Sequence, residues 1–345
     1  MYTDHYGLSD RPFQLTPDAR FYFDSRTHKK AMAYLGYGLA QGEGFIVVTG
    51  EVGAGKSTLV AHLMATIDTE RLNAINLVST QVDGDDMLRL AAQGMGLATE
   101  GVAKAQLLDR IEQQLTDQAR IGKRTLLIVD EAQTLPVSAL EELRMLSNFQ
   151  SQGRALIQIF LLGQPEFRDK LDHTQGLEQL RQRVIASHHL EPMEASEVEP
   201  YIVHRMAVAG WQGRPAFDPA AFAALYRHTD GIPRRINQLA TRVLLYAAME
   251  KLDCIDADAV ETVAGDMAGE TGKAPEDRVL PLRVSAVPDR PRQPEPVHDL
   301  GAERRVAVLE ARLEEQEAAL RRVLTLLVDW VEDGQEIPGY RTSAA

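Results

Sequence analysis

Short apolar runs alternate with amphipathic stretches over the first 190 residues of the chain. The runs are bounded by polar or glycine residues and are typical of strands buried on both faces of a parallel sheet. We expect strands at 45–48, 74–78, 125–131, 156–162 and 184–190. The stretches between them have helical periodicity, at 26–40, 58–64, 85–97, 104–119 and 140–149. Because strands and helices alternate, the pattern predicts a three-layer α/β sandwich around a five-stranded parallel sheet.

The pattern changes beyond Pro192, where the apolar runs stop. Helical stretches follow at 197–209, 219–227, 234–248 and 257–267. They predict a small all-helical lid domain at 193–268, after an α/β core at 28–192. The opening segment, 1–27, is rich in aromatic and turn residues. We expect its rings to pack on the core, where they could also cover a nucleotide base.

Two further segments follow the helical domain. Residues 269–301 contain repeated prolines with almost no helical periodicity, which predicts a Pro-rich linker. At 302–332, from Val306 to Trp330, core positions alternate spacings of three and four, which predicts a coiled-coil helix. That helix could fold back on its own domain, but the linker that detaches it favours self-association or a partner helix. A short tail occupies 333–345.

Composition narrows the function classes. The 37 Lys and Arg against 50 Asp and Glu give a net charge of -13, which disfavours nucleic acid and anionic membrane surfaces as partners. Cys254 is the single cysteine, so no intramolecular disulfide is expected, and its side chain is predicted to be buried. No apolar run is long enough to cross a membrane. The expected location is the cytoplasm, or the periphery of the inner membrane through a partner.

A glycine-rich loop with the pattern GxxxxGKS follows the first predicted strand and precedes a helical stretch. Its glycines let backbone N–H groups converge on phosphate, and the helix adds its positive dipole end. Lys56 can reach the β- and γ-phosphates, and the Ser57 hydroxyl can bind the accompanying Mg2+. We therefore expect ATP and Mg2+ as cofactors. The predicted nucleotide contacts are Gly50, Glu51, Val52, Gly53, Ala54, Gly55, Lys56, Ser57 and Thr58.

Two adjacent acids, Asp130 and Glu131, end the third predicted strand. One carboxylate there can orient the magnesium shell, and the next can accept a proton from the water that attacks the γ-phosphate. The pair predicts ATP hydrolysis rather than phosphoryl transfer to another acceptor. Gln164 follows the fourth strand, and its amide is predicted to sense the γ-phosphate if that strand lies beside the phosphate-binding one.

Arginines at two places are candidates for contacts with a nucleotide. Arg181 and Arg183 precede the fifth strand, and either could be offered to a nucleotide in a neighbouring subunit or remain solvated. Arg234 lies in the first turn of a helix whose entry a glycine and a proline fix, so it can reach back across a cleft. Arg235 is the alternative. No metal site is expected beyond the nucleotide-bound Mg2+.

With these parts in place, the chain from about His28 to Met267 resembles the AAA+ ATPases. Within them it is similar to the general secretion pathway protein A type. That likeness is carried by Tyr6-Gly7-Leu8, Pro12-Phe13, Leu15-Thr16-Pro17-Asp18, the loop at 50–56 and Leu162-Gly163-Gln164-Pro165-Glu166. Two further stretches, 42–45 and 177–184, look closer to the ATPase associated with the exosortase A and PEP-CTERM system of the bacterial envelope.

The resemblance implies roles for residues that match the motifs. Lys56 and Ser57 would hold nucleotide and magnesium, Asp130 and Glu131 would form the Walker B pair, and Gln164 and Arg234 would be the two sensors. Secretion ATPases of this type typically carry a membrane span and a peptidoglycan-binding domain. Here the linker and the coiled coil stand in their place, so we expect no direct contact with the cell wall.

The leading hypothesis is an ATP-hydrolysing switch or motor that forms a nucleotide-dependent homo-oligomer. It would serve export or assembly of an envelope component through a protein partner, such as a polysaccharide-export protein that could bind the coiled coil. The alternative is an ATP-dependent DNA-binding regulator of the transposition type, which the net charge disfavours. An autophosphorylating tyrosine kinase of polysaccharide export lacks its expected tyrosine cluster, since the tail has only Tyr340.

Overall fold

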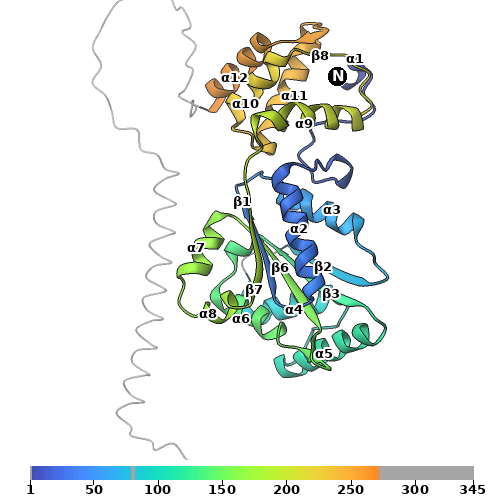
Figure 1. Cartoon of the computed structure of the whole chain (residues 1–345), viewed down its shortest axis with the longest axis vertical. Coiled ribbons are helices and arrows are strands. Elements are labelled where there is room, and N and C mark those ends of the chain that lie inside the picture. The colour runs from blue at the N-terminus through green and yellow to red at the C-terminus, as the bar shows by residue number, and fades with distance from the viewer. Residues whose placement is uncertain (1, 79–81, 272–345) are drawn as a thin grey trace, which may run out of the picture. The chain divides into compact units, whose positions relative to one another are not determined.

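The computed structural model describes residues 2–78 and 82–271, which fall within one compact unit (Figure 1). The predicted linker beyond residue 271, the coiled coil at 302–332 and the tail at 333–345 lie outside the described residues. Those three predictions therefore stay predictions.

The core is built on a five-stranded parallel sheet with the strand order β2-β3-β6-β1-β7. Its strands are β1 (Phe45–Gly50), β2 (Leu72–Val78), β3 (Arg124–Asp130), β6 (Ile157–Gly163) and β7 (Val184–Leu190). β6 lies between β1 and β3, with Thr49 paired to Gly163 and Val129 paired to Leu161. The fold class predicted from the apolar runs is confirmed.

Helices cover both faces of this sheet. One face packs on α2 (Arg26–Gln41) and α3 (Lys56–Thr66), and the other on α4 (Gly84–Gly94), α5 (Lys104–Arg120), α6 (Val137–Leu146) and α7 (Pro165–His173). Successive strand residues alternate between the two layers: Ile46 and Val48 pack with α2 and α3, whereas Phe45 and Val47 pack on the opposite side. The continuous apolar runs are thus explained by burial on both faces.

Several short elements were not predicted. They are α1 (Tyr2–Tyr6), α7, α8 (Glu178–Arg181), the 3-10 helices η1 (Ala19–Phe21) and η2 (Ala132–Thr134), and the hairpin of β4 (Gln150–Ser151) and β5 (Arg154–Ala155). Most are too short for periodicity to detect. The start of α7 had a usable signal, because Pro165 occupies the first helical position, where a proline is favoured.

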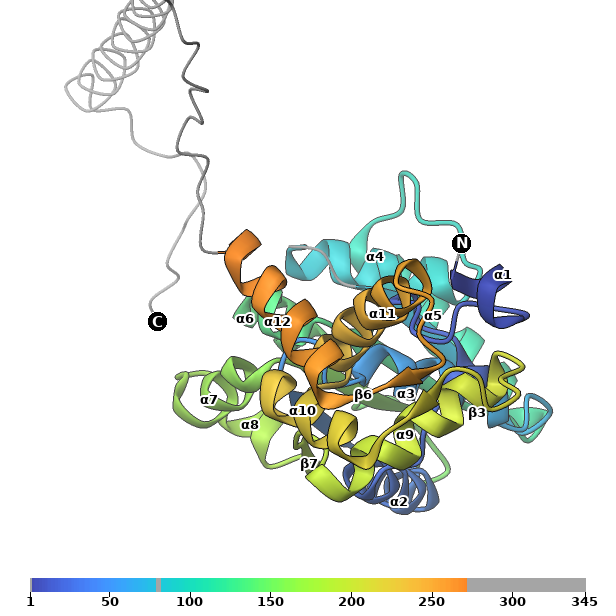
Figure 2. The ribbon, with the colours of Figure 1, turned by 90° about the horizontal axis from the view of Figure 1, so that it is seen from above.

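The lid is a bundle of α9 (Ala195–Val208), α10 (Pro219–Thr229), α11 (Pro233–Met249) and α12 (Ala257–Thr271), which Figure 2 shows gathered together. Strands do not stop entirely at Pro192, because β8 (Ala216–Phe217) pairs with β9 (Cys254–Ile255). The prediction that Cys254 is buried is wrong. Adjacent residues of a strand face opposite sides, and here Ile255 faces the lid interior while Cys254 is exposed.

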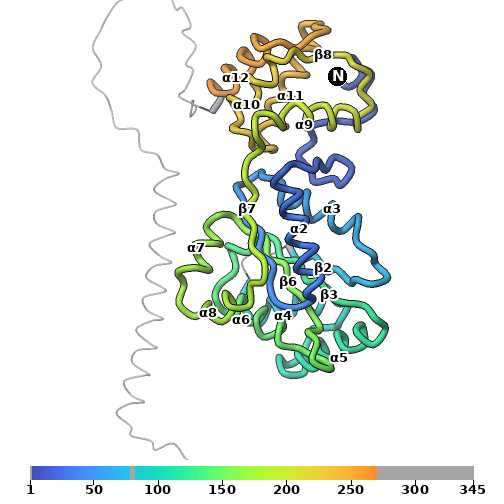
Figure 3. The backbone as a smooth tube through the Cα atoms, viewed as in Figure 1, coloured from blue at the N-terminus to red at the C-terminus, as the bar shows by residue number. Residues whose placement is uncertain are grey.

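The N-terminal segment packs on the lid, so the prediction that it packs on the core is wrong for its first half. Tyr2, Tyr6, Leu8 and Phe13 belong to the apolar cluster of α9, α11 and α12. The Tyr6 hydroxyl donates to the Leu252 carbonyl at 2.9 Å. Four short helices bury little apolar surface by themselves, and these side chains complete their core. Figure 3 shows the segment running along the lid before it reaches α2.

A backbone hydrogen bond joins the turn before α11 to the segment that leaves the core. Met193 N donates to the Gly231 carbonyl at 2.9 Å, just before α11 begins. Gly231 has φ +72, and a Cβ on it would lie 2.1 Å from the Met193 carbonyl oxygen. Only glycine allows this close approach with this backbone conformation. The turn therefore fixes where α11 starts relative to the last core strand.

We expect Gly231→Ala to lower the free energy of unfolding more than Gly213→Ala. Both positions have positive φ, +72 and +88, so both variants share a left-handed strain of about 1 kcal/mol. At Gly213 an added Cβ would meet no described atom within 4 Å, whereas at Gly231 it must displace the Met193 backbone. Urea unfolding of the two variants is the measurement, with an expected difference of about 1–3 kcal/mol. Equal losses would show that the turn tolerates a side chain.

Candidate nucleotide-binding site

The glycine-rich loop lies between the end of β1 at Gly50 and the start of α3 at Lys56. Two of its glycines are required by close neighbours and by positive φ. A Cβ on Gly53 (φ +87) would lie 2.3 Å from the Cβ of Arg234, which comes from the lid. A Cβ on Gly55 (φ +100) would lie 2.7 Å from Nε2 of His28 in α2. The loop is therefore held between a core helix and the lid.

Lys56 and Ser57 make hydrogen bonds with groups at the end of the sheet. Lys56 Nζ donates to the carbonyls of Gly50 at 2.7 Å and Glu51 at 3.1 Å. Burial lowers the pKa of Lys56, while the nearby carboxylates, led by Glu131, oppose that change. Ser57 Oγ donates to Oδ2 of Asp130 at 3.1 Å. The two residues predicted as magnesium ligands thus lie together, and their oxygens are the donor type that Mg2+ prefers.

Glu131 is held by two glutamine amides. It has φ 55, in the left-handed region, at the junction of β3 and η2. Its Oε2 accepts hydrogen bonds from Nε2 of Gln133 and, at 3.3 Å, from Nε2 of Gln164. Gln133 Oε1 in turn accepts from the backbone N of Gln164 at 3.0 Å. Because that backbone group can only donate, it fixes which end of the Gln133 amide faces the carboxylate.

The position of Gln164 depends on the sheet order, which the sequence did not show. β6 lies beside β1, so Gln164 at its end lines the same cavity as the loop. Gln133 was missed by the sequence analysis. Its only sequence signal was a second amide two residues after Glu131.

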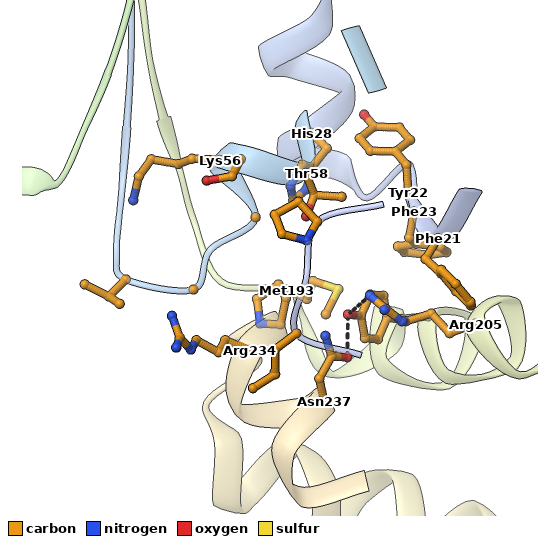
Figure 4. Close-up of a pocket in the computed structure, with 18 of the residues that line it drawn as sticks. Phe21, Tyr22, Phe23, His28, Lys56, Thr58, Met193, Arg205, Arg234 and Asn237 are labelled. Atoms are coloured by element: carbon orange, nitrogen blue, oxygen red, sulfur yellow. Dashed lines mark hydrogen bonds between the residues drawn. The ribbon is translucent and has the colours of Figure 1, made fainter. Parts of the chain in front are cut away.

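A cavity of about 270 Å3 lies between the loop, the lid and the N-terminal segment. The loop contributes Val52, Gly53, Gly55, Lys56, Ser57 and Thr58 to its lining, whereas Gly50, Glu51 and Ala54 do not line it. Figure 4 shows Lys56 and Arg234 at one end and Phe21, Tyr22 and Arg205 at the other. One end therefore carries cations suited to phosphate, and the other carries aromatic side chains that offer a flat base an apolar wall.

His28 is a lining residue to which the sequence analysis gave no role. Its Nδ1 lies 2.7 Å from Ser25 Oγ, and its Nε2 side faces Gly55. Burial lowers the pKa of His28 to about 4, against the opposing effect of nearby Asp24. At neutral pH the ring is uncharged, so it supports the loop as a neutral hydrogen-bonding group.

The candidate arginines lie in different places. Arg234 lines the cavity, and its backbone N donates to the Gly53 carbonyl at 3.2 Å. Arg235 is paired with Asp230 at 2.9 Å on the surface and does not line the cavity. The structure therefore favours Arg234 over Arg235 as the lid residue near the loop.

Arg181 and Arg183 are not brought to the cavity. Arg181 Nη1 donates to the Asp172 carbonyl at 2.6 Å, and Arg183 Nη1 donates to Ser147 Oγ at 3.0 Å. The Arg183 carbonyl accepts from Phe45 N at the start of β1, five residues from Gly50. At strand rise this is roughly 16 Å from the loop. Neither arginine lines the cavity of its own chain.

The described residues contain no group of His, Cys, Asp and Glu side chains that could hold a metal ion by itself. None of the helices in 2–78 and 82–271 is both long enough and apolar enough to cross a membrane.

Comparison with known proteins agrees with this architecture. Residues 39–171 match the AAA domain family. Over 248 residues the chain is 38% identical to General secretion pathway protein A of Aeromonas hydrophila, an alignment that covers 72% of this chain and 45% of that protein. The chain thus spans less than half the length of this relative.

Solved structures share this fold at low sequence identity. The ORC2 protein of Aeropyrum pernix in its ADP form has 16% identity and a TM-score of 0.56, over 75% of this chain and 73% of that one. Cdc6p from Pyrobaculum aerophilum has 14% identity and a TM-score of 0.56, over 75% and 71%. These likenesses concern the fold alone. The loop and the sheet order show the P-loop NTPase fold, residues 39–171 match the AAA domain family, and 72% of the chain is similar to General secretion pathway protein A.

Proposed function

We propose that this protein binds ATP with Mg2+, hydrolyses it, and uses the cycle as an oligomeric switch or motor in export or assembly at the bacterial envelope. The observation that carries the proposal is the convergence of Lys56, Ser57, Asp130, Glu131 and Gln164 on one edge of the sheet. The distances between their polar groups there are 3.1 Å from Ser57 to Asp130 and 3.3 Å from Gln164 to Glu131.

The phosphate end of the cavity fits a nucleotide and its magnesium ion. The ion, when bound, neutralises charge on the β- and γ-phosphates. Ser57 and Asp130 would hold it, because their oxygens already lie at hydrogen-bond distance. Lys56 would exchange the carbonyls of Gly50 and Glu51 for phosphate oxygens, a stronger partner for an ammonium group.

Glu131 is the proposed general base. Its carboxylate would accept the proton of the attacking water as the bond to the γ-phosphorus forms and the β–γ bridging bond breaks, which gives ADP and phosphate. Gln133 and Gln164 both donate to Oε2 of that carboxylate and so orient it. The Gln164 amide can also contact the γ-phosphate, so loss of that phosphate would change the hydrogen bond between Gln164 and Glu131.

The cellular role is supported by similarity rather than by the site. The relative named General secretion pathway protein A shares 38% identity, and the stretches at 42–45 and 177–184 favour the exosortase-linked branch of exopolysaccharide or protein sorting. We propose a cytoplasmic protein that forms nucleotide-dependent homo-oligomers and contacts an envelope partner through residues 302–332.

We expect Glu131→Gln to abolish turnover while ATP binding stays within about threefold of the unaltered protein. Loss of a general base lowers the rate by about 10²–10⁴-fold, and the amide keeps the size of the side chain. Lys56→Ala should weaken ATP binding by tenfold or more, because a charge-assisted contact is lost. Phosphate release and calorimetric titration measure the two effects. The matched control is Glu112→Gln on the exposed face of α5; an equal loss of turnover there would refute the assignment of Glu131.

Arg234→Ala should weaken ATP binding by about tenfold, whereas Arg235→Ala should change it less than twofold. Arg234 lines the cavity, and Arg235 is paired with Asp230 away from it. A single charged contact to phosphate is worth a factor of about ten or more. Titration of the two variants side by side is the measurement. Equal losses of affinity in the two variants would show that Arg234 does not contact the nucleotide.

Mg-ATP should raise the molar mass of the Glu131→Gln protein in solution, measured by light scattering. The shift should be lost in Lys56→Ala and reduced when residues 301–345 are deleted.

Arg181 and Arg183 do not line the cavity of their own chain, so alanine at the one that acts between subunits should lower turnover without weakening ATP binding. A molar mass that is the same with and without Mg-ATP would rule out the nucleotide-dependent switch and leave both arginines as surface residues.

A further inference from the structure

Arg205 of α9 is a buried cation that satisfies its charge without a carboxylate. Its side chain is 6% exposed, and it forms no ion pair within the part of the chain that the structure describes. Nε donates to the Pro12 carbonyl at 2.6 Å, and Nη2 donates to the Gln14 carbonyl at 3.3 Å. The guanidinium also lies 5.0 Å from the ring centre of Phe21. Carbonyl oxygens and aromatic faces together replace the water that this charge gives up.

A third donor of Arg205 sets the direction of a hydrogen-bond chain. Nη1 donates to the Tyr201 hydroxyl at 3.1 Å, and that hydroxyl lies 2.7 Å from Oδ1 of Asn237. Arginine has no acceptor, so the hydroxyl oxygen accepts and its hydrogen is free for Asn237. Burial raises the pKa of Tyr201, which keeps that hydrogen in place at neutral pH. The carbonyl end of the Asn237 amide must therefore face Tyr201.

The amide nitrogen of Asn237 is left as a donor facing the cavity. Asn237 lines the cavity, is 6% exposed and lies one turn after Arg234 on α11. The oxygen of this amide, not its nitrogen, bonds the Tyr201 hydroxyl. Among the described residues no acceptor bonds this nitrogen. This nitrogen is not among the fully buried atoms that lack a partner, so it reaches the open part of the cavity, where a bound molecule can replace water as its acceptor.

We propose that Asn237 is a specificity-determining residue that donates a hydrogen bond to a ring nitrogen of adenine, and that Arg205 and Tyr201 are positioning residues that fix it as a donor. The inference rests on the proposed function, because it requires ATP in this cavity. The cations Lys56 and Arg234 lie at the other end, so phosphate there leaves the base beside Phe21, Tyr22 and Asn237. The three adenine nitrogens N1, N3 and N7 are acceptors.

The same guanidinium joins base recognition to the N-terminal segment. Arg205 binds the carbonyls of Pro12 and Gln14 while it orients Tyr201. Leu15, Pro17 and Phe21 of that segment line the same cavity. The buried Arg205 side chain therefore fixes the position of the N-terminal segment and the orientation of the Asn237 amide together.

The test measures dissociation constants for ATP and for 1-deaza-, 3-deaza- and 7-deaza-ATP, each of which replaces one ring nitrogen by a C–H group. We expect the unaltered protein to bind one of the three about 5–30-fold more weakly than ATP, the usual effect of leaving a buried donor unpaired. Asn237→Asp, which replaces the donor by an acceptor, should weaken ATP binding by tenfold or more and bind ATP and that analogue equally. Tyr201→Phe should reduce the discrimination, because the amide is then free to turn. The matched control is Gln238→Glu, the same change at the next residue, which is exposed and does not line the cavity.

The outcomes separate the two proposals. Equal binding of all three analogues by the unaltered protein would overturn the inference, whether or not the variants fold, as would discrimination that survives Asn237→Asp. 2′-Deoxy-ATP is titrated in the same way, and weaker binding confined to it would also overturn the inference, because the acceptor would then be the ribose. Failure of the unaltered protein to bind ATP at all would overturn the proposed function and this inference together.

Discussion

The parallel register of β1, β3 and β6 is the constraint on which the site depends. Pairing of Thr49 with Gly163 and of Val129 with Leu161 makes the three strands end side by side. A loop, two carboxylates and an amide from distant parts of the sequence are thereby delivered to one edge. The strands are buried on both faces, and a one-residue slip would exchange the side chains that face the two helix layers. Packing of the core thus fixes the register that brings the site residues together.

The lid and the N-terminal segment depend on a second constraint, the burial of charge and of apolar rings in a small helical bundle. Arg205 can stay buried only because the Pro12 and Gln14 carbonyls and the Tyr201 hydroxyl accept its hydrogen bonds. Removal of the segment would therefore expose apolar surface and also leave a cation unsatisfied. This explains why residues at the start of the chain belong structurally to a domain that begins at 193.

The parts of the fold that follow from local pattern could be predicted, and the parts that follow from long-range contact could not. Five apolar runs gave the sheet, and the loop and acids gave the phosphate end of the site, because each signal lies within about ten residues. Gln133 meets Gln164 across 31 residues, and Tyr6 meets Leu252 across 246. No periodicity records such pairs. Arg205 and Tyr201 are four residues apart on one helix, so their contact was predictable, but its burial against the N-terminal segment was not.

The two ends of the cavity differ in what ATP must displace. At the phosphate end Lys56 is bonded to two carbonyls, Ser57 to Asp130, and Glu131 to two amides. A nucleotide there exchanges existing hydrogen bonds for new ones, and an exchange contributes only about 0.5–1.5 kcal/mol for a typical bond. The Asn237 nitrogen has no described partner to give up. A contact there replaces water rather than an internal hydrogen bond, so base recognition leaves the hydrogen bonds of the folded chain intact.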